Sequence, residues 1–188
     1  MIRRGGNVKE TIIKAAMKVF ARHGFRAPVG LIAMEAGVSK GLVFWHFRSK
    51  RELIVEVARR ALPTDVIKGC ISKGLEGEEL LKCVGMNYLS KYGSKEMRAL
   101  LINTFALANI NSVVEGEVLR VCGKLLNTIA SKVYGNLGDE SIVKVRAFFG
   151  ALLCYVLNPP EGTSQEDYLR ILLKLFKPYT QTDMHSVS

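Results

Sequence analysis

The sequence predicts an all-α protein, and three observations lead to this fold class. Apolar residues recur three or four positions apart along most of the chain, which is the spacing of one helix face. Glycine and proline stand between these apolar segments, where they can end one helix before the next begins. No stretch alternates apolar and polar residues as a half-buried strand does. We therefore expect an N-terminal three-helix helix-turn-helix domain over residues 1–63 and a larger helical domain over residues 64–188.

The first two helices are marked by their ends. The first is expected over about residues 7–23, where Asn7 can cap it and Gly24 stops it. The second opens at Ala27 and Pro28, because proline suits the first helical position, although alanine is a poor cap. The residues expected to face inward from the first helix are Ile12, Ala16, Val19 and Phe20.

Residues 33–50 predict two short helices joined by a tight turn, with a further helix directly behind them. Gly37 suits the left-handed conformation that ends a helix, and Ser39 can cap the next one. Val43 and Phe47 fall on one face of that next helix and are expected to be buried. Its other face carries glycine, lysine, histidine and aromatic side chains, which is typical of a helix that reads a DNA major groove. These outward residues are Lys40, Gly41, Leu42, Phe44, Trp45 and His46.

The positive charge of the chain is concentrated at its N-terminal end. Residues 1–60 hold 13 Lys and Arg against 4 acidic residues, a net charge of +9, whereas residues 61–188 hold 14 against 13, a net charge of +1. This asymmetry indicates a polyanion-binding domain attached to a second domain, with a merely solvated basic surface as the alternative. Arg3 and Arg4 form a basic arm that can reach the DNA minor groove or phosphates, or equally a solvated tail.

The sequence from Ile32 to Leu53 resembles the DNA-binding domain of the TetR family of transcriptional repressors. The matching residues are Ile32-Ala33-x-x-Ala36-Gly37-Val38-Ser39-Lys40-Gly41 and Phe44-Trp45-His46-Phe47-x-Ser49-Lys50-x-x-Leu53. The match extends back to Ile12 and covers about the first third of the chain, while the remainder is similar only in length and helical character. The resemblance implies binding to double-stranded DNA through Ser39, Lys40, Gly41, Leu42, Phe44, Trp45, His46 and Lys50.

The chain departs from the family pattern at three places. Ala27-Pro28 stand where the family usually has threonine, Leu42 where it often has threonine or serine, and Phe44 where it usually has tyrosine. Each change removes a hydroxyl that can donate to a phosphate, although Leu42 can contact a thymine methyl instead. Trp45 is expected either to contact DNA or to pack against the first helix.

The rest of the chain predicts helices at about residues 49–62, 65–72, 76–92, 95–108, 115–134, 139–157 and 165–176. Ser49 and Glu52 form a capping box for the first of these, and Pro63 ends it. Asp139 is expected to cap the helix at 139–157, and residues 181–188 to form a frayed tail. In TetR proteins the helix corresponding to 49–62 links the DNA-reading unit to a regulatory domain.

The helix at 139–157 predicts a homodimer. It carries no charged residue from Ala147 to Leu157, and its bulky apolar side chains surround the axis. A helix that is apolar on all sides must be covered on all sides, so a second subunit is expected on one face, with the central helix of a monomer as the alternative. The resemblance implies a four-helix bundle with residues 115–134 as the companion helix. The expected interface residues are Leu126, Phe148, Phe149, Leu152, Leu153 and Val156.

The resemblance also implies a small effector that changes DNA binding. An apolar pocket with a few polar groups is the usual form of such a site, and the stretch from about residue 76 to residue 111 offers both kinds of side chain. Its few charges favour a lipophilic compound, although the same residues fit a core and its surface. The candidate pocket residues are Cys83, Met86, Asn87, Thr104, Phe105 and Ala108.

The four cysteines, Cys70, Cys83, Cys122 and Cys154, lack the short spacing of a zinc site and have no histidine cluster beside them. We therefore expect buried free thiols in a reducing cytoplasm, and neither a metal nor a cofactor. The N-terminus has no apolar signal core, and no run reaches the about 20 apolar residues that span a bilayer. The predicted location is cytoplasmic, without a membrane partner.

These patterns favour a ligand-responsive transcriptional regulator, a repressor by resemblance, which binds a palindromic operator as a dimer and is released by its effector. An enzyme is not expected, because Gly123-Lys124 lacks the other residues of a phosphate-binding loop and no catalytic triad or carboxylate pair is found. The alternative is a sequence-tolerant architectural DNA-binding protein without an effector, which the lost hydroxyls at Leu42 and Phe44 leave open. Peripheral membrane binding is disfavoured by the compact helix-turn-helix pattern.

Overall fold

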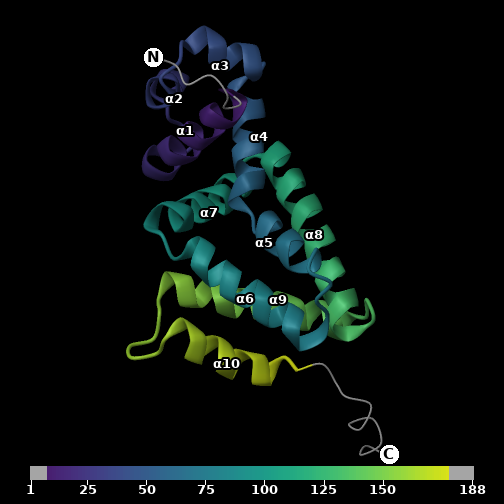
Figure 1. Cartoon of the computed structure of the whole chain (residues 1–188). Coiled ribbons are helices and arrows are strands. Elements are labelled where there is room, and N and C mark those ends of the chain that lie inside the picture. Colours follow the sequence, from purple (N-terminus) through teal and green to yellow (C-terminus); the bar gives the residue numbers. More distant parts are fainter. Residues whose placement is uncertain (1–7, 178–188) are drawn as a thin grey trace, which may run out of the picture. The chain divides into compact units, whose positions relative to one another are not determined.

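The computed structural model describes residues 8–177, and all regular structure within that range is α-helical (Figure 1). The all-α prediction is therefore confirmed. Arg3, Arg4, Asn7 and the tail at 181–188 lie outside the described residues. The helices are α1 (Val8–His23), α2 (Val29–Ala36), α3 (Lys40–His46), α4 (Lys50–Ala61), α5 (Thr64–Ile71), α6 (Gly77–Tyr92), α7 (Lys95–Ala108), α8 (Ser112–Tyr134), α9 (Asp139–Leu157) and α10 (Gln165–Leu175).

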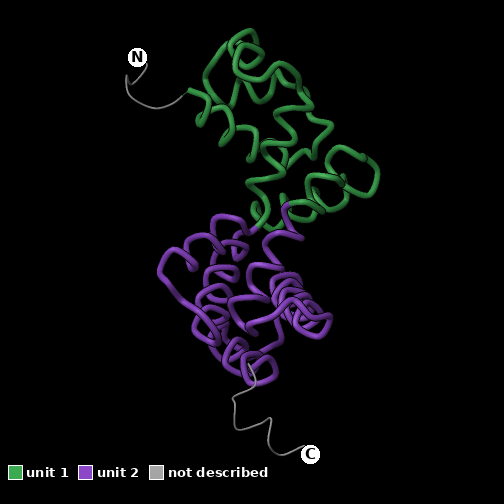
Figure 2. Tube along the Cα trace, turned by 90° about the vertical axis from the view of Figure 1, so that its right-hand side faces the viewer, with its two compact units in different colours: residues 1–62, 95–120 green, residues 63–94, 121–188 purple. Residues whose placement is uncertain are grey.

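The chain divides into two compact units, coloured separately in Figure 2. Unit 1 comprises residues 1–62 together with 95–120, and unit 2 comprises residues 63–94 together with 121–188. Unit 1 therefore contains α1 to α4, α7 and the first part of α8. Unit 2 contains α5, α6, the rest of α8, α9 and α10.

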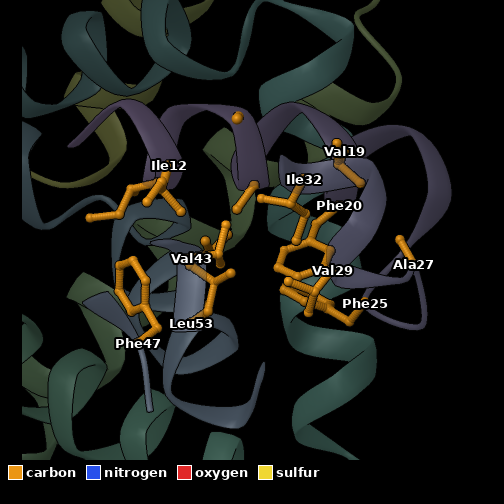
Figure 3. Close-up of a cluster of buried hydrophobic side chains, with 14 of the residues drawn as sticks. Ile12, Val19, Phe20, Phe25, Ala27, Val29, Ile32, Val43, Phe47 and Leu53 are labelled. Atoms are coloured by element: carbon orange, nitrogen blue, oxygen red, sulfur yellow. The ribbon is translucent and has the colours of Figure 1, made fainter. Parts of the chain in front are cut away.

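The core of unit 1 is formed where α1 packs against α2, α4 and α7 (Figure 3). Its central side chains are almost entirely buried because each helix turns one apolar stripe inward. From α7, Leu100 joins this core, and the side-chain amide of Asn103 donates a hydrogen bond of 3.1 Å to the carbonyl of Phe20. The main core residues are Ile12, Phe20, Phe25, Val29, Ile32, Val43, Phe47, Leu53 and Val57.

The second helix begins one residue later than the sequence predicts. Pro28 has φ −70° and ψ 147°, an extended conformation, so it is the N-cap and the first helical residue is Val29. The Pro28 side chain makes no capping hydrogen bond. The expectation that Pro28 opens the helix itself is therefore wrong by one position. Ala27 is buried in the core of unit 1, which gives this small apolar residue a packing role.

Two later helices begin at asparagine side chains that precede the predicted starts. α8 starts at Ser112, three residues before the expected Glu115, because the Asn111 side chain accepts from the backbone N–H of Val114 at 3.2 Å. α9 has Gly138 as its N-cap, and not Asp139. The Asn136 side-chain oxygen accepts from both the Gly138 N–H and the Ser141 hydroxyl, at 2.9 and 2.7 Å.

In unit 2, α6 packs against α5, α9 and α10. Gly85 is buried at the centre of this packing, and a Cβ atom placed on it would lie 2.5 Å from Leu169 Cδ1 and 3.3 Å from Phe148 Cζ. Only glycine therefore lets α6 come so close to these two side chains without a shift. Among the described residues no single helix is long and apolar enough to cross a membrane; α7 and α8 reach such a composition only when joined across a bend of 117°.

The cysteines differ from the sequence prediction of buried free thiols. Cys70 on α5 and Cys83 on α6 form a disulfide, with Cα atoms 5.9 Å apart. Cys122 is free and half-buried, and Cys154 is free and exposed. A separation of 13 residues gave no sequence signal for pairing, because the two sulfur atoms meet only when α5 and α6 pack together.

Candidate nucleic-acid interface

Helix α3 is shaped by the residues at its two ends. The Ser39 side chain accepts a hydrogen bond from the backbone N–H of Leu42 at 3.1 Å, which confirms the expected N-cap. Before it, Gly37 ends α2 with φ +65°, a left-handed conformation in which a Cβ atom is strained. Val43 and Phe47 are each 1% exposed and fix the inner face of α3 in the core of unit 1. The predicted turn between two short helices is therefore confirmed.

The outer face of α3 presents a polar and aromatic surface to solvent. Trp45 is 75% exposed and Phe44 is 40% exposed, so Trp45 does not pack against α1. The Trp45 and His46 rings meet edge to face, with centroids 4.6 Å apart. Lys40 and Gly41 are exposed, whereas Leu42 and His46 are half-buried. Because Gly41 has no side chain, it leaves the α3 backbone open to a close approach.

Helix α4 starts next to this surface with a double cap. The Ser49 hydroxyl accepts from the N–H of Glu52 at 3.2 Å, and the Glu52 carboxylate accepts from the N–H of Arg48 at 3.0 Å. The capping box is thus present, with the carboxylate reaching Arg48 and not Ser49. The backbone N–H of Glu52, in the first turn of α4, and that of Arg48, just before the helix, thus both donate to side chains of the protein itself.

Lys50 is tied to the loop before α2. Its ammonium Nζ donates a hydrogen bond of 3.0 Å to the carbonyl of Arg26. Partial burial lowers the pKa of Lys50 from its ordinary value of 10.5, because burial penalises the charged form. An ammonium has three donors, so two remain for an anion while the third joins the start of α4 to the turn after α1.

Basic side chains also lie on the other helices and turns of unit 1. Lys18 pairs with Glu35 at 3.2 Å, and Lys9 lies 5.4 Å from the centre of the Phe47 ring. These two cations therefore already have partners within the unit. Further exposed cations lie in α1, in the turns and at the start of α4, where they supply the positive potential that a phosphate backbone requires. They are Lys14, Arg22, Arg26, Arg48 and Arg51.

The six candidate effector residues fall in two units. In unit 2, the Asn87 amide donates to the Cys83 carbonyl at 2.7 Å, and Met86 is half-buried. In unit 1, the buried Thr104 hydroxyl donates to the Leu100 carbonyl at 2.8 Å. The remaining two are Phe105, half-buried, and Ala108, buried, both on α7.

An open cavity of about 330 Å³ lies between α5 and α6 in unit 2. Of the candidate effector residues, only Asn87 lines it. The other lining residues carry no motif in the sequence, although the four-residue spacing of Asp65, Gly69 and Lys73 puts them on one side of a helix. The lining residues are Asp65, Val66, Gly69, Cys70, Lys73, Asn87, Ser90 and Lys91.

The six candidate dimer residues differ in exposure. Phe148, Leu152 and Val156 are buried within unit 2 itself, so their side chains face the protein's own core. Leu126, Phe149 and Leu153 are half-buried. The exposed residues between positions 143 and 157 of α9 are Val143, Arg146, Ala147, Gly150, Cys154 and Leu157, which form its outer face.

Comparisons with known proteins agree with this geometry. The family model described as "Bacterial regulatory proteins, tetR family" matches residues 12–57. The HTH-type transcriptional regulator YerO of Bacillus subtilis (strain 168) is 33% identical over 100 residues, which cover 50% of this chain and 35% of YerO. The "Probable acrEF/envCD operon repressor" of Escherichia coli (strain K12) is 24% identical over 122 residues, which cover 61% of this chain and 56% of that protein. The chain thus spans about a third to just over half of these relatives' lengths.

Solved structures show the same fold over nearly the whole chain. A TetR-like transcriptional regulator from Rhodococcus sp. RHA1 has a TM-score of 0.71 at 19% identity, covering 92% of this chain and 96% of that one. Salmonella enterica GusR has a TM-score of 0.71 at 17% identity, covering 90% and 93%. Multidrug binding protein EbrR, solved with imidazole, has a TM-score of 0.67 at 18% identity, covering 95% and 99%. The capped α2–turn–α3 motif thus lies within residues 12–57, the segment that matches the tetR-family model, and the described chain has the fold of these solved structures.

Proposed function

We propose that this protein is a ligand-responsive transcriptional repressor that binds a palindromic operator as a homodimer. The observation that carries the proposal is the outer face of α3. Trp45, Phe44 and Lys40 are exposed there while Val43 and Phe47 hold the helix in the core. Two neighbouring exposed aromatic side chains beside a lysine, on a helix whose other face is buried, form a surface that a DNA groove can cover.

The same face has the chemistry of a nucleic-acid contact. Lys40 at the start of α3 can donate to a guanine edge or a phosphate, and the half-buried Leu42 can meet a thymine methyl. The two remaining donors of Lys50 and the first-turn N–H groups of α4 suit a phosphate. Surrounding exposed cations supply the sequence-independent attraction. Such a regulator acts on chromosomal DNA, so we place it in the cytoplasm, and the proposed role requires no catalysis.

Selection of bound sequences from random duplex DNA tests this function against the architectural alternative. A repressor of this kind is expected to enrich one palindrome whose half-site centres lie about 34–36 Å apart. It should bind that palindrome on the order of a thousandfold or more tighter than random duplex at the same salt concentration. Equal affinity for selected and random duplexes would instead support a sequence-tolerant architectural protein.

For the homodimer, we propose that the second copy meets the outer face of α9 together with the half-buried Phe149 and Leu153 beside it. Gly150 lies in the middle of this face, and a Cβ atom there would meet no other atom of its own chain within 4 Å. The protein's own packing therefore gives no reason for a glycine, which costs about 1 kcal/mol in a helix. Gly30, Gly69, Gly116 and Gly123 are equally open, so what singles out Gly150 is its place on the exposed face of the uncharged stretch 147–157 of α9, where a partner helix can approach closely. Ala147 is small and exposed one turn earlier.

The variant Gly150→Glu separates the dimer from the fold. Glutamate favours a helix more than glycine does, so the subunit itself should fold. A charge in a two-fold interface meets its own copy and should yield monomers in sedimentation velocity, with operator binding strongly weakened. Gly69→Glu is the matched control, because Gly69 is also a helical glycine with no atom near its Cβ position. Dimers that persist in Gly150→Glu would place the interface elsewhere.

The effector is proposed from the family and from two similar proteins. EbrR is named a multidrug binding protein and was solved with imidazole, and an Escherichia coli relative is named a repressor. We propose a small and largely lipophilic compound that contacts part of the set Cys83, Met86, Asn87, Thr104, Phe105 and Ala108. Repeating the DNA selection with a panel of lipophilic compounds should identify those that release the operator. A panel without effect on operator binding, together with retained specificity, would count against a lipophilic effector.

A further inference from the structure

We propose that Cys70 and Cys83 form a reversible thiol–disulfide site that reacts with small anionic disulfides of the glutathione class. The two residues join α5 to α6 by a disulfide across 13 residues of sequence, with Cα atoms 5.9 Å apart. This separation lies within the range of about 4.4–6.8 Å that a disulfide requires. The packing of α5 on α6 therefore holds both cysteines at bonding distance.

The inference rests on the proposed function in one respect, the compartment. A DNA-binding regulator works where glutathione and thioredoxin keep thiols reduced. Disulfides that form in such proteins are transient and serve catalysis or redox sensing. A cysteine pair held at bonding distance in this compartment is therefore expected to cycle between the dithiol and the disulfide.

The two cysteines have unequal access and share one polar neighbour. Cys83 is half-buried and Cys70 is 1% exposed, so a reagent reaches Cys83 first. Asn87 stands one turn after Cys83 on α6, and its amide nitrogen lies 3.6 Å from Cys83 Sγ and 3.8 Å from Cys70 Sγ. An N–H donor placed between two sulfur atoms stabilises negative charge on either one.

The open cavity beside the pair supplies a site for an anionic reagent. Cys70 and Asn87 line this cavity of about 330 Å³, a volume in the range of small-molecule sites, and Cys83, which is not among the lining residues, is linked to it through the Asn87 amide 3.6 Å from its sulfur. Lys73 and Lys91 also line it, and the Lys91 ammonium pairs with Asp65. Two lysines against one aspartate leave the lining positive, so it attracts a disulfide that carries carboxylates.

The reaction proceeds by two exchanges. The Cys83 thiol loses its proton to solvent, and the resulting thiolate attacks one sulfur of the small disulfide. The bond between the two small-molecule sulfurs breaks, a mixed disulfide with Cys83 forms, and one small thiolate leaves and takes up a proton. The Cys70 thiolate then attacks the Cys83 sulfur, and the second small thiolate leaves in the same way. Two electrons pass from the protein dithiol to the small disulfide, which becomes two thiols. Excess small thiol reverses both steps.

A redox titration of the whole chain tests the site. The variant Cys122→Ser with Cys154→Ser leaves Cys70 and Cys83 as the cysteines to be counted. After equilibration in glutathione buffers from fully reduced to fully oxidised, alkylation and mass spectrometry count the free thiols. The count should fall reversibly from two to none. The oxidised fraction should rise from about one tenth to about nine tenths over an about 80-fold change in the ratio of squared thiol concentration to disulfide concentration, as a two-electron couple requires. Reduction should lower Tm by about 5–10 °C, since it opens a short covalent loop.

Two outcomes would overturn the proposal. Either two free thiols persist in the most oxidising buffer, or the disulfide survives unchanged in the most reducing one. DNA binding is no part of this measurement, so a chain that fails to bind DNA loses the proposed function without deciding the cysteine chemistry.

The role of the positive cavity is tested by the variant Lys73→Gln. It should slow oxidation by glutathione disulfide about two- to threefold, the effect of one partly screened charge. Oxidation by the neutral bis(2-hydroxyethyl) disulfide should keep its rate. Lys68→Gln is the control, because Lys68 is exposed on α5 and does not line the cavity. Equal slowing by both reagents, or slowing of neither, would remove the preference for anionic disulfides.

Discussion

Removal of the Glu117 carboxylate should destabilise unit 1 in a pH-dependent way. Glu117 on α8 accepts hydrogen bonds of 2.6 Å from Arg59 on α4 and from Arg120 one turn further along α8. These bonds, that from Arg59 above all, lower the pKa of Glu117 from 4.5 to about 2. The side chain is only 11% exposed, whereas the two arginine side chains are 47% and 62% exposed.

The size of the effect follows from the pKa. A fall from 4.5 to about 2 corresponds to at most about 3 kcal/mol of folding free energy, and solvent screening at the half-exposed arginines reduces this to about 1–2 kcal/mol. The folded-state pKa of Glu117 is the lower one, so the stabilisation is fully present above about pH 5 and disappears as the pH falls towards 2. About three quarters of it should remain at pH 4 and about two fifths at pH 3.

The test compares the variant Glu117→Gln with the parent chain in urea unfolding at several pH values. At pH 7 the free energy of unfolding should be about 1–2 kcal/mol lower in the variant, and the difference should shrink between pH 5 and pH 3. Glu115→Gln is the control, because Glu115 is exposed on the same helix and such changes usually stay within about 0.5 kcal/mol. A difference that is independent of pH would show that charge on Glu117 is not its cause.

Three further predictions concern the α3 surface. Ser39→Ala removes the cap on Leu42 and should lower the free energy of unfolding by about 1 kcal/mol in denaturant titrations, with weaker operator binding; unchanged stability would mean that another group caps α3. Trp45→Ala should leave the free energy of unfolding within about 0.5 kcal/mol of the parent and weaken operator binding about tenfold, whereas unaltered affinity in a gel-shift assay would remove Trp45 from the interface. Lys50→Met keeps the side-chain stem but loses the bond to Arg26, and it should lower the slope of log affinity against log salt by about one; an unchanged slope would show that Lys50 serves Arg26 alone.

The helix-turn-helix elements could be predicted almost residue by residue because their signals are local. Gly37, Ser39 and the Ser49–Glu52 pair each act within four positions of the chain, and the structure shows each in its expected place. The start of α2 was wrong by one residue. A proline can stand at the N-cap or at the first helical position, so the sequence alone does not tell which of these two positions Pro28 occupies.

Features that depend on packing between helices were not predictable in the same way. The Cys70–Cys83 bond joins residues on two helices whose pairing no spacing rule encodes. The apolar run on α9 predicted a helix covered on all sides, but it did not tell which side chains the subunit itself covers. Phe148 and Leu152 prove to be buried within unit 2, and this leaves Gly150 on the outer face. The cavity beside α5 likewise depends on how α6 lies against it.

The membership of α7 in unit 1 has a consequence for engineering hybrid regulators. Leu100 lies in the same core as Ile12 and Phe20, and Asn103 binds the Phe20 carbonyl. A chimera joined after Leu62 would carry α1 to α4 without α7, the helix that covers part of their core. Ile12 and Phe20 would then pack against residues of the other protein. Exchange of operator specificity between relatives should therefore succeed by grafting the outer residues of α3, or by moving residues 95–120 together with the first 62.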